Sequence, residues 1–414
     1  MKRVSLLLVL LMLIGAIGAS AQEEVTLRLS SWQWEDPSYL PFWQQTTEAF
    51  MEAYPGVTIE RFSFPLDQLF DRVDLEVAGG TPPDIIEVTG FNVFEYIDKG
   101  VLEPLNACFE GTDIVEKVAG QDSYAVDDMG NIFALNLSAR TLALWVHQPM
   151  FDEAGIDVPT DFESFMAAAQ ALTNPDEEEF GLVLTNTAHS RLYEGVLIMI
   201  VGHGGHYTKD GQPAFTEPEV IAGVQFFKDL FDAGVMPRGI DGAGSQWPYF
   251  NSGKVGMTID GPWYWANLGI ASPEVQSTVT IHPLPTDSAR PTGGPNNLVG
   301  IAAGGSHKDL ACEYIKSIAT TEWGQVWTNN SGTVNPIEGA VTDSFLMDNP
   351  WFQTFAEDGP NFVPVAAPGL EVYHGDVVRI INNRLVEVLY DDRPVEEAMA
   401  DLQADVEEFL EDAM

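Results

Sequence analysis

Strands and helices alternate along the first part of the chain, as the spacing of hydrophobic positions indicates. Polarity alternates over residues 26–31 and again near 57–59, which predicts two strands. Apolar positions repeat at helical spacing over 43–54 and 66–77, and a third strand is predicted over 84–88. This β-α-β-α-β order predicts an α/β fold with a largely parallel sheet, whose ligands bind beyond the carboxyl ends of the strands.

The same alternation continues through the rest of the chain. Further elements are predicted at 132–146 (extended), 162–172 (helical), 220–231 (helical), and 255–259, 279–284 and 298–303 (all extended). Two last helices are predicted over 377–388 and 395–409, the second of them after Pro394. Hydrophobic residues make up 45% of the 414 residues, which is enough for large cores, and this length indicates two domains.

The N-terminus has the layout of a secretory signal peptide. A basic pair at 2–3 precedes an apolar run over 4–17, and small residues at 19–21 predict cleavage before Gln22. The apolar run is too short for a comfortable membrane span, and no cysteine near Gln22 offers a lipid attachment point. We therefore expect residues 1–21 to be removed and the mature chain of about 390 residues to be periplasmic.

Acidic side chains greatly outnumber basic ones. There are 62 Asp and Glu against 19 Lys and Arg, a formal net charge of -43. Such a charge repels nucleic acid and anionic lipid, so we exclude both as partners. The carboxylates are scattered along the chain, which favours a solvated acidic surface over a cation site. Because salt screens the self-repulsion of such a surface, our hypothesis is a saline habitat.

The chain carries few signs of metal or catalytic chemistry. Cys108 and Cys312 are the two cysteines, and they either pair in the oxidising export compartment or remain buried thiols. His203 and His206 lie in a glycine turn without an evident third metal ligand. The motifs GxxxxGK[ST], HExxH and GxSxG are absent from the sequence. We therefore expect no catalytic residues, no metal and no cofactor, with a secreted glycoside hydrolase as the alternative.

Several stretches resemble, in the same order, the family of extracellular solute-binding proteins of ABC importers that includes the maltose-binding protein. The most specific stretch is 250–265, with the sequence FNSGKVGMTIDGPWYW. The other similar stretches are 79–86, 94–105, 130–151, 157–165 and 298–319. Together they extend over nearly the whole mature chain.

The resemblance implies a two-lobed periplasmic binding protein fold with several crossing segments and a ligand cleft between the lobes. The implied lobes are 23–138 plus 302–332, and 139–301 plus 333–414. The implied function is to capture a sugar or oligosaccharide by hinge closure and to deliver it, as a monomer, to an ABC permease. A glycerol phosphodiester, an acidic sugar or another polar solute is the alternative ligand, and a sensory module is an alternative role.

The resemblance also implies where a ligand is contacted. Sugars need aromatic faces for their C–H surfaces and polar groups for their hydroxyls. Trp263, in a Gly-Pro-Trp turn, is the first candidate for stacking. The loop after the first strand adds Trp32 and Trp34 as further aromatics, with Glu35 and Asp36 as acceptors of sugar hydroxyls.

Further candidates come from later segments. Asn92 follows the third strand as a neutral hydrogen-bonding group, and Trp247 lies in a predicted loop after a glycine-rich stretch. Arg140, at the first crossing, either binds the ligand or pairs across the hinge. The remaining candidates are Tyr193, Glu194, Asn296, Tyr373 and His374.

Overall fold

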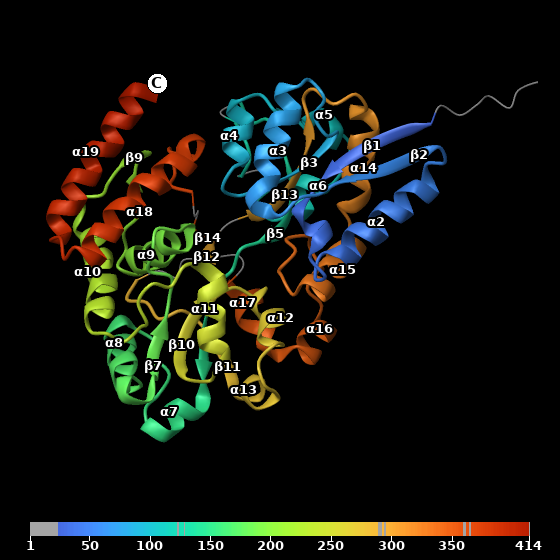
Figure 1. The fold of residues 1–414 in the computed structure, drawn as a ribbon. Coiled ribbons are helices and arrows are strands. Elements are labelled where there is room, and N and C mark those ends of the chain that lie inside the picture. Colours follow the sequence, from blue (N-terminus) through green and yellow to red (C-terminus); the bar gives the residue numbers. More distant parts are fainter. Residues whose placement is uncertain are drawn as a thin grey trace, which may run out of the picture.

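The computed structural model describes residues 24–121, 124–127, 129–288, 292–293, 295–358, 362–363 and 366–413. The predicted signal peptide over 1–21 lies outside the described residues. Figure 1 shows two α/β lobes, one built mainly from the blue N-terminal segments and the other from the green, yellow and red segments. The α/β prediction and the two-lobed architecture are confirmed.

The first lobe is built on a six-stranded sheet with the order β2-β1-β3-β13-β4, in which β5 also pairs with β13. Its strands are β1 (Val25–Ser30), β2 (Val57–Phe62), β3 (Ile85–Thr89), β4 (Leu102–Glu103), β5 (Leu135–Ala139) and β13 (Pro295–Ala302). β1 runs parallel to β2 and β3, as predicted. β13 is antiparallel to its neighbours, so the sheet is mixed.

Helices cover this sheet and close the first hydrophobic core. They are α2 (Leu40–Ala53), α3 (Leu66–Ala78), α4 (Val93–Asp98), α5 (Asn106–Phe109), α6 (Ile114–Lys117), α14 (Lys308–Ile318) and α15 (Thr321–Ser331), with the 3-10 turn η1 (Trp32–Glu35) after β1. Leu27 and Leu29 of β1 are fully buried, because alternate residues of this strand face the helices. Phe42 and Trp43 of α2 and Tyr314 of α14 pack in the same cluster.

The second lobe is built on a four-stranded sheet with the order β11-β6-β10-β7. Its strands are β6 (Ala143–His147), β7 (Phe180–Val183), β10 (Val255–Asp260) and β11 (Val279–His282). Two small two-stranded sheets are β8 (Thr208–Lys209) with β9 (Gln212–Pro213), and β12 (Thr292–Gly293) with β14 (Phe362–Val363). β10 is buried along its whole length, so its polar residues Thr258 and Asp260 are buried together with its apolar ones.

The helices of the second lobe surround its sheet on the outside (Figure 1). They are α7 (Gln148–Ala154), α8 (Phe162–Ala171), α9 (Ser190–Gly202), α10 (Pro218–Asp232), α11 (Gly242–Asn251), α12 (Tyr264–Leu268), α13 (Pro273–Thr278), α16 (Asp343–Asp348), α17 (Gln353–Asp358), α18 (His374–Tyr390) and α19 (Val395–Ala413). Short 3-10 turns are η2 (Pro175–Glu177), η3 (Pro350–Phe352) and η4 (Glu371–Tyr373). Helix α9 is buried almost throughout, and α10, α18 and α19 pack around it in one core.

The chain first crosses between the sheets at Arg140, because β5 belongs to the first sheet and β6 to the second. A later crossing comes before Pro295 rather than at 302. β13 pairs with β3 through Asn297–Ile301, so these residues lie in the first sheet, whereas the predicted second lobe extended over 139–301. The strand β13 itself was predicted correctly. Its antiparallel partner β3 lies far earlier in the chain, so no local sequence pattern indicates that the two strands pair.

Cys108 and Cys312 form a disulfide that joins α5 to α14, across a sequence separation of 204 residues. This pairing settles the choice that the sequence left open between a bridge and two thiols. Both helices belong to the outer part of the first lobe.

Among the residues that the structure describes, none of the helices is long and apolar enough to span a membrane.

Candidate functional site

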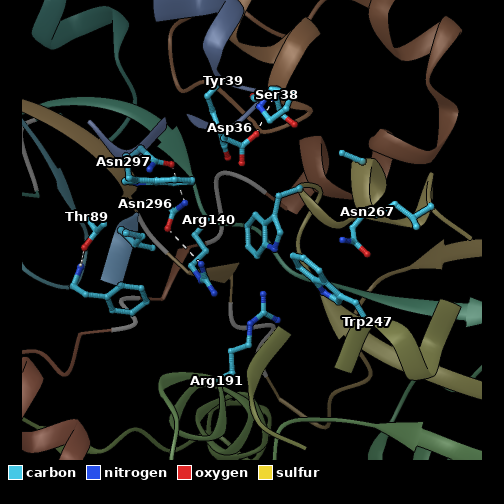
Figure 2. Close-up of a pocket in the computed structure, with 18 residues that line it drawn as sticks. Asp36, Ser38, Tyr39, Thr89, Arg140, Arg191, Trp247, Asn267, Asn296 and Asn297 are labelled. Carbon is cyan, nitrogen blue, oxygen red and sulfur yellow. Dashed lines mark hydrogen bonds between the residues drawn. The ribbon is translucent and has the colours of Figure 1, made fainter. Parts of the chain in front are cut away.

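A cavity of about 630 Å³ lies between the lobes (Figure 2), within the usual size range of small-molecule sites. The first lobe lines it with the loop after β1 and the segment after β3: Trp32, Asp36, Pro37, Ser38, Tyr39, Thr89 and Phe91. The second lobe lines it with α9, α11, and α12 and its flanks: Arg191, Trp247, Trp263, Ala266, Asn267 and Ile270. Arg140, Asn296 and Asn297 lie between these two walls.

The loop after β1 holds its shape through short-range hydrogen bonds. The Ser31 hydroxyl caps η1 by accepting the backbone N–H of Gln33 at 3.0 Å. The Asp36 carboxylate accepts the backbone N–H of Ser38 at 2.8 Å. Trp32 packs edge-on against buried Tyr39, with ring centroids 5.6 Å apart. The predicted loop is therefore a capped turn that presents one aromatic face and one carboxylate to the cavity.

Arg140 lines the cavity and also pairs across the hinge; the pairing is observed, and ligand binding by Arg140 stays a prediction. Its guanidinium donates to the Glu194 carboxylate through Nε at 2.5 Å and Nη2 at 2.6 Å. Nη1 lies 3.4 Å from the Asn296 Oδ1 of the first lobe. Burial alone would raise the pKa of Glu194, but the neighbouring Arg140 charge holds this pKa below its ordinary value. The pair is thus ionised and fixed in a two-bond geometry.

The Arg140 guanidinium lies over two aromatic rings, those of Trp263 and Phe91. Its Cζ lies 4.7 Å from the ring centroid of Trp263 and 5.6 Å from that of Phe91. Trp263 comes from the second lobe and Phe91 from the first. The guanidinium is therefore held in position between the lobes, next to two aromatic faces.

A second arginine, Arg191, reaches the cavity from the start of α9. It donates to the buried carboxylate of Asp260 through Nη1 at 3.0 Å. Asp260 also accepts the indole N–H of Trp247 at 2.6 Å, which fixes the ring against the cavity. Trp247 lies on helix α11 and not in a loop, because the glycine-rich stretch before it forms the first turn of that helix.

The predicted stacking residue, Trp263, depends on the glycine two positions before it. A Cβ at Gly261 would lie 2.1 to 2.4 Å from the Trp263 ring atoms, so only glycine allows the ring to fold back over the turn. Trp263 then starts α12, which places Asn267 on the same wall of the cavity. The close approach of the Trp263 ring therefore explains why the Gly-Pro-Trp turn begins with glycine.

Other predicted residues near the first-lobe wall do not line the cavity. Trp34 is buried against Trp43, with Arg61 over its ring, and Glu35 is exposed to solvent. Asn92 accepts the backbone N–H of Thr89 at 2.8 Å and its hydroxyl at 3.0 Å. It acts on the cavity only by orienting Thr89.

The later predicted aromatics also lie behind the walls. Tyr193 is buried inside the second lobe, and Tyr373 packs edge-on against Phe409. His374 stacks on Phe91 with ring centroids 5.2 Å apart, so it supports a cavity residue from behind. Burial lowers the pKa of His374 to about 4, which keeps its ring uncharged at neutral pH.

The cavity is close to electrically balanced, despite its two arginines. Arg140 is paired with Glu194 and Arg191 with Asp260, and Asp36 adds a further carboxylate. Each guanidinium has five N–H donors, so some remain for a ligand after these bonds. Within the described ranges no group of three or more His, Cys, Asp or Glu is arranged to hold a metal ion. The site therefore offers aromatic faces and hydrogen-bond donors and acceptors from both lobes.

The comparisons with known proteins agree with this geometry. Residues 35–325 match the model of the bacterial extracellular solute-binding protein family. A binding protein of Brucella abortus (strain 2308) is 23% identical over 341 residues, which cover 80% of this chain and 81% of that relative.

Solved structures of similar shape extend over almost the whole chain. Maltose-bound MalE3 of T. maritima has a TM-score of 0.81 at 19% identity, covering 93% of this chain and 100% of that one. A solute-binding protein of Thermotoga lettingae bound with α-D-tagatose has a TM-score of 0.80 at 19% identity, covering 94% and 100%. The GacH receptor of Streptomyces glaucescens, solved with acarbose, has a TM-score of 0.78 at 20% identity, covering 94% and 98%. Because the family model matches most of the length of this chain, the chain belongs to the bacterial extracellular solute-binding proteins.

Proposed function

We propose that this protein captures a sugar or oligosaccharide in the periplasm and delivers it, chemically unchanged, to the membrane permease of an ABC transporter. The observation that carries this proposal is the composition of the cavity walls. Aromatic faces come from both lobes, at Trp32, Trp247 and Trp263, and they alternate with hydrogen-bonding groups. We expect the protein to act as a monomer and without a cofactor.

The wall chemistry matches the two surfaces of a sugar. The C–H face of a pyranose ring buries apolar area against an indole, as at Trp263. The hydroxyl rim needs donors and acceptors, and charged partners give the stronger hydrogen bonds. Arg140 and Arg191 supply donors, and Asp36 supplies acceptors.

Closure of the lobes follows from the distribution of these groups. A ligand that contacts Trp32 on one lobe and Trp263 on the other binds the closed form more tightly than the open form. Its binding energy therefore shifts the population toward the closed form, which would then dock on the permease. Arg140 lies at a crossing segment and bonds toward both lobes, so it would hold the hinge in register.

The ligands of similarly folded proteins support a sugar or a related polyhydroxy compound. Maltose, α-D-tagatose and acarbose are bound by the three structures described above, and a solute-binding protein of Agrobacterium radiobacter was solved with ribitol. These four compounds form a natural first panel of probes.

A second candidate ligand is an acidic sugar or a glycerol phosphodiester, which the two arginines in the cavity favour. Each arginine, however, already has a carboxylate partner within hydrogen-bonding distance. An anion would have to compete with Glu194 and Asp260 and would also meet Asp36. This balance of charge favours a neutral ligand over an anionic one.

A thermal-shift screen tests the proposal. The mature protein is heated with maltose, tagatose, ribitol and acarbose, and separately with the acidic sugar glucuronate and the glycerol phosphodiester glycerophosphocholine. A ligand at a hundredfold excess over its dissociation constant stabilises the folded state by about 2.7 kcal/mol. We expect a shift with a neutral compound and unchanged sugar after prolonged incubation. A thermal shift with the last two compounds alone would mean that the ligand is the second candidate, an acidic sugar or a glycerol phosphodiester. Release of hydrolysis products would indicate an enzyme.

A further inference from the structure

Glu87 is a fully buried carboxyl group directly behind the first-lobe wall of the cavity. It lies in the middle of β3, the central strand that leads to the cavity, and its exposed fraction is zero. Its Oε2 is hydrogen-bonded to the Ser31 hydroxyl, and its Oε1 accepts the Asn297 amide at 3.1 Å. Backbone N–H groups of Trp32 and Gln33 also point to this carboxyl. A single side chain therefore touches the segment after β1 and the start of β13.

Both of these segments present residues to the cavity. Trp32 follows Ser31 and lines the first-lobe wall, and Asn297 lines the cavity itself. The Asn297 Oδ1 accepts hydrogen bonds from the Ser138 hydroxyl at 2.8 Å and from the Asn296 amide at 3.0 Å.

The hydrogen bonds continue from Asn296 into the hinge. Asn296 faces the Arg140 guanidinium, as the dashed line in Figure 2 marks, and Arg140 is bound to Glu194 of the second lobe. A continuous chain of hydrogen bonds thus runs from Glu87 to the crossing segment. Such a chain fixes side-chain orientations, because each amide has few alternative partners in a buried site.

We propose that Glu87 is the positioning residue of the first-lobe wall, which fixes Trp32 and the Asn296–Asn297 pair in the orientation that binds ligand. This role rests on the proposed function, because orientation of the wall matters for affinity only if the cavity takes a ligand. Glu87 itself does not line the cavity.

The cost of burying Glu87 favours a specific role for this side chain over general support of the fold. Burying a carboxyl group is costly, and the strand residues on either side of Glu87, Ile86 and Val88, are apolar. Truncation of Glu87 would leave the Ser31 hydroxyl and the Asn297 amide without this hydrogen-bond partner, so both would take new orientations. Burial raises the pKa of Glu87 to about 8, although its hydrogen bonds act in the opposite direction, so its protonated form prevails at neutral pH. Glutamine is then a close substitute.

The other end of the same strand offers a matched control. Asp84, just before β3, is also buried and also ties β1 to the segment after β13. It accepts the backbone N–H of Arg28 at 2.9 Å and those of Ser306 and His307 at 3.1 and 3.2 Å. Asp84 does not line the cavity, and neither do its partners. Asp84→Asn therefore perturbs a comparable buried carboxylate without reaching the ligand.

The test compares Glu87→Ala, Glu87→Gln and Asp84→Asn. Dissociation constants for maltose, tagatose, ribitol and acarbose are measured by tryptophan fluorescence at neutral pH, together with each variant's melting temperature. We expect Glu87→Ala to weaken binding about tenfold or more. Glu87→Gln should restore most of the affinity, and Asp84→Asn should lower the melting temperature but leave the affinity unchanged. Equal affinity in Glu87→Ala and wild type would overturn the proposal.

A second readout needs no ligand. Each variant is also made with Trp32→Phe, and the difference in acrylamide quenching isolates the exposure of Trp32. Glu87→Ala should make Trp32 more accessible, whereas Glu87→Gln and Asp84→Asn should not. If the wild type binds none of the four sugars, the proposed function fails, but this readout still decides the role of Glu87. Unchanged quenching of Trp32 in Glu87→Ala contradicts the positioning role in either case.

Discussion

At the scale of residues, the sequence could identify aromatic and polar groups in the loops beyond strands, but not their orientation. Trp32, Asp36, Trp247, Trp263 and the crossing segment's arginine were predicted and line the cavity. Neighbours with the same chemistry do not, because each residue along a helical turn rotates the side-chain direction by about a third of a circle. Trp34, two positions after Trp32 in the 3-10 turn η1, therefore points to a different side and is buried.

Trp265 lies two positions after the predicted stacking residue Trp263 and provides a control for its substitution. Trp263→Ala removes the stacking face, and we expect sugar affinity to fall about tenfold or more, since a well-packed aromatic anchor carries a large share of binding energy. Trp265→Ala should leave the affinity unchanged, because Trp265 stacks on Trp351 with ring centroids 4.3 Å apart and does not line the cavity. Titration calorimetry measures both, and an equal loss in the two variants would contradict the assignment of the stacking face.

The buried carboxyl of Glu87 predicts a particular dependence of stability on pH. Its pKa is raised to about 8 when folded, from an ordinary value of 4.5. Between these values the folded state holds a proton that the unfolded state has lost, so stability falls as pH rises, by up to ~1.4 kcal/mol per pH unit. Below pH 4.5 and above about pH 8, the contribution of Glu87 to the free energy of unfolding no longer changes with pH.

Glu87→Gln lacks the titrating group, so the difference between the two proteins isolates it. Urea unfolding of wild type and Glu87→Gln across the window should show the wild type losing stability relative to the variant as pH rises. The many exposed carboxylates titrate in both proteins and cancel in the difference. A difference that stays constant with pH would contradict the raised pKa.

At the scale of elements, regular periodicity predicted the existence and type of the long helices and of the early strands. Helix α10 and strand β3 have the predicted place, because α10 repeats apolar residues at helical spacing and β3 is a short, mostly apolar run after the break at Pro82-Pro83. The sequence could not predict that β13 joins the first sheet, since pairing between distant strands is decided by tertiary packing. Arg191 was missed for a similar reason: it reaches the cavity through Asp260, which lies 69 residues later.

The disulfide between α5 and α14 predicts a large effect on stability and a small one on binding. It closes a loop over a sequence separation of 204 residues, and the chain-entropy model assigns about 5 kcal/mol to a loop of this length. The double variant Cys108→Ser and Cys312→Ser should lose stability of this order in urea unfolding. Its sugar affinity should not change, because neither helix lines the cavity. A variant as stable as the wild type would show that the bridge constrains little in the unfolded chain.

At the scale of the whole molecule, the acidic surface predicts dependence on salt. A net charge of -43 gives strong self-repulsion, which acts over about 30 Å at 0.01 M salt but only about 3 Å at 1 M. We expect the melting temperature to rise steadily between these two concentrations of sodium chloride. Unfolding that is indifferent to salt would contradict the hypothesis of adaptation to a saline habitat.

A crystal structure with ligand shows whether a sugar binds between the lobes. The mature protein would be crystallised with the neutral compound that gives the largest thermal shift. We expect electron density for one sugar in the cavity, with its C–H face on Trp263 and its hydroxyls toward Arg140 and Asp36. Sugar density on an outer surface, or an empty cavity in crystals that hold the sugar elsewhere, would contradict it.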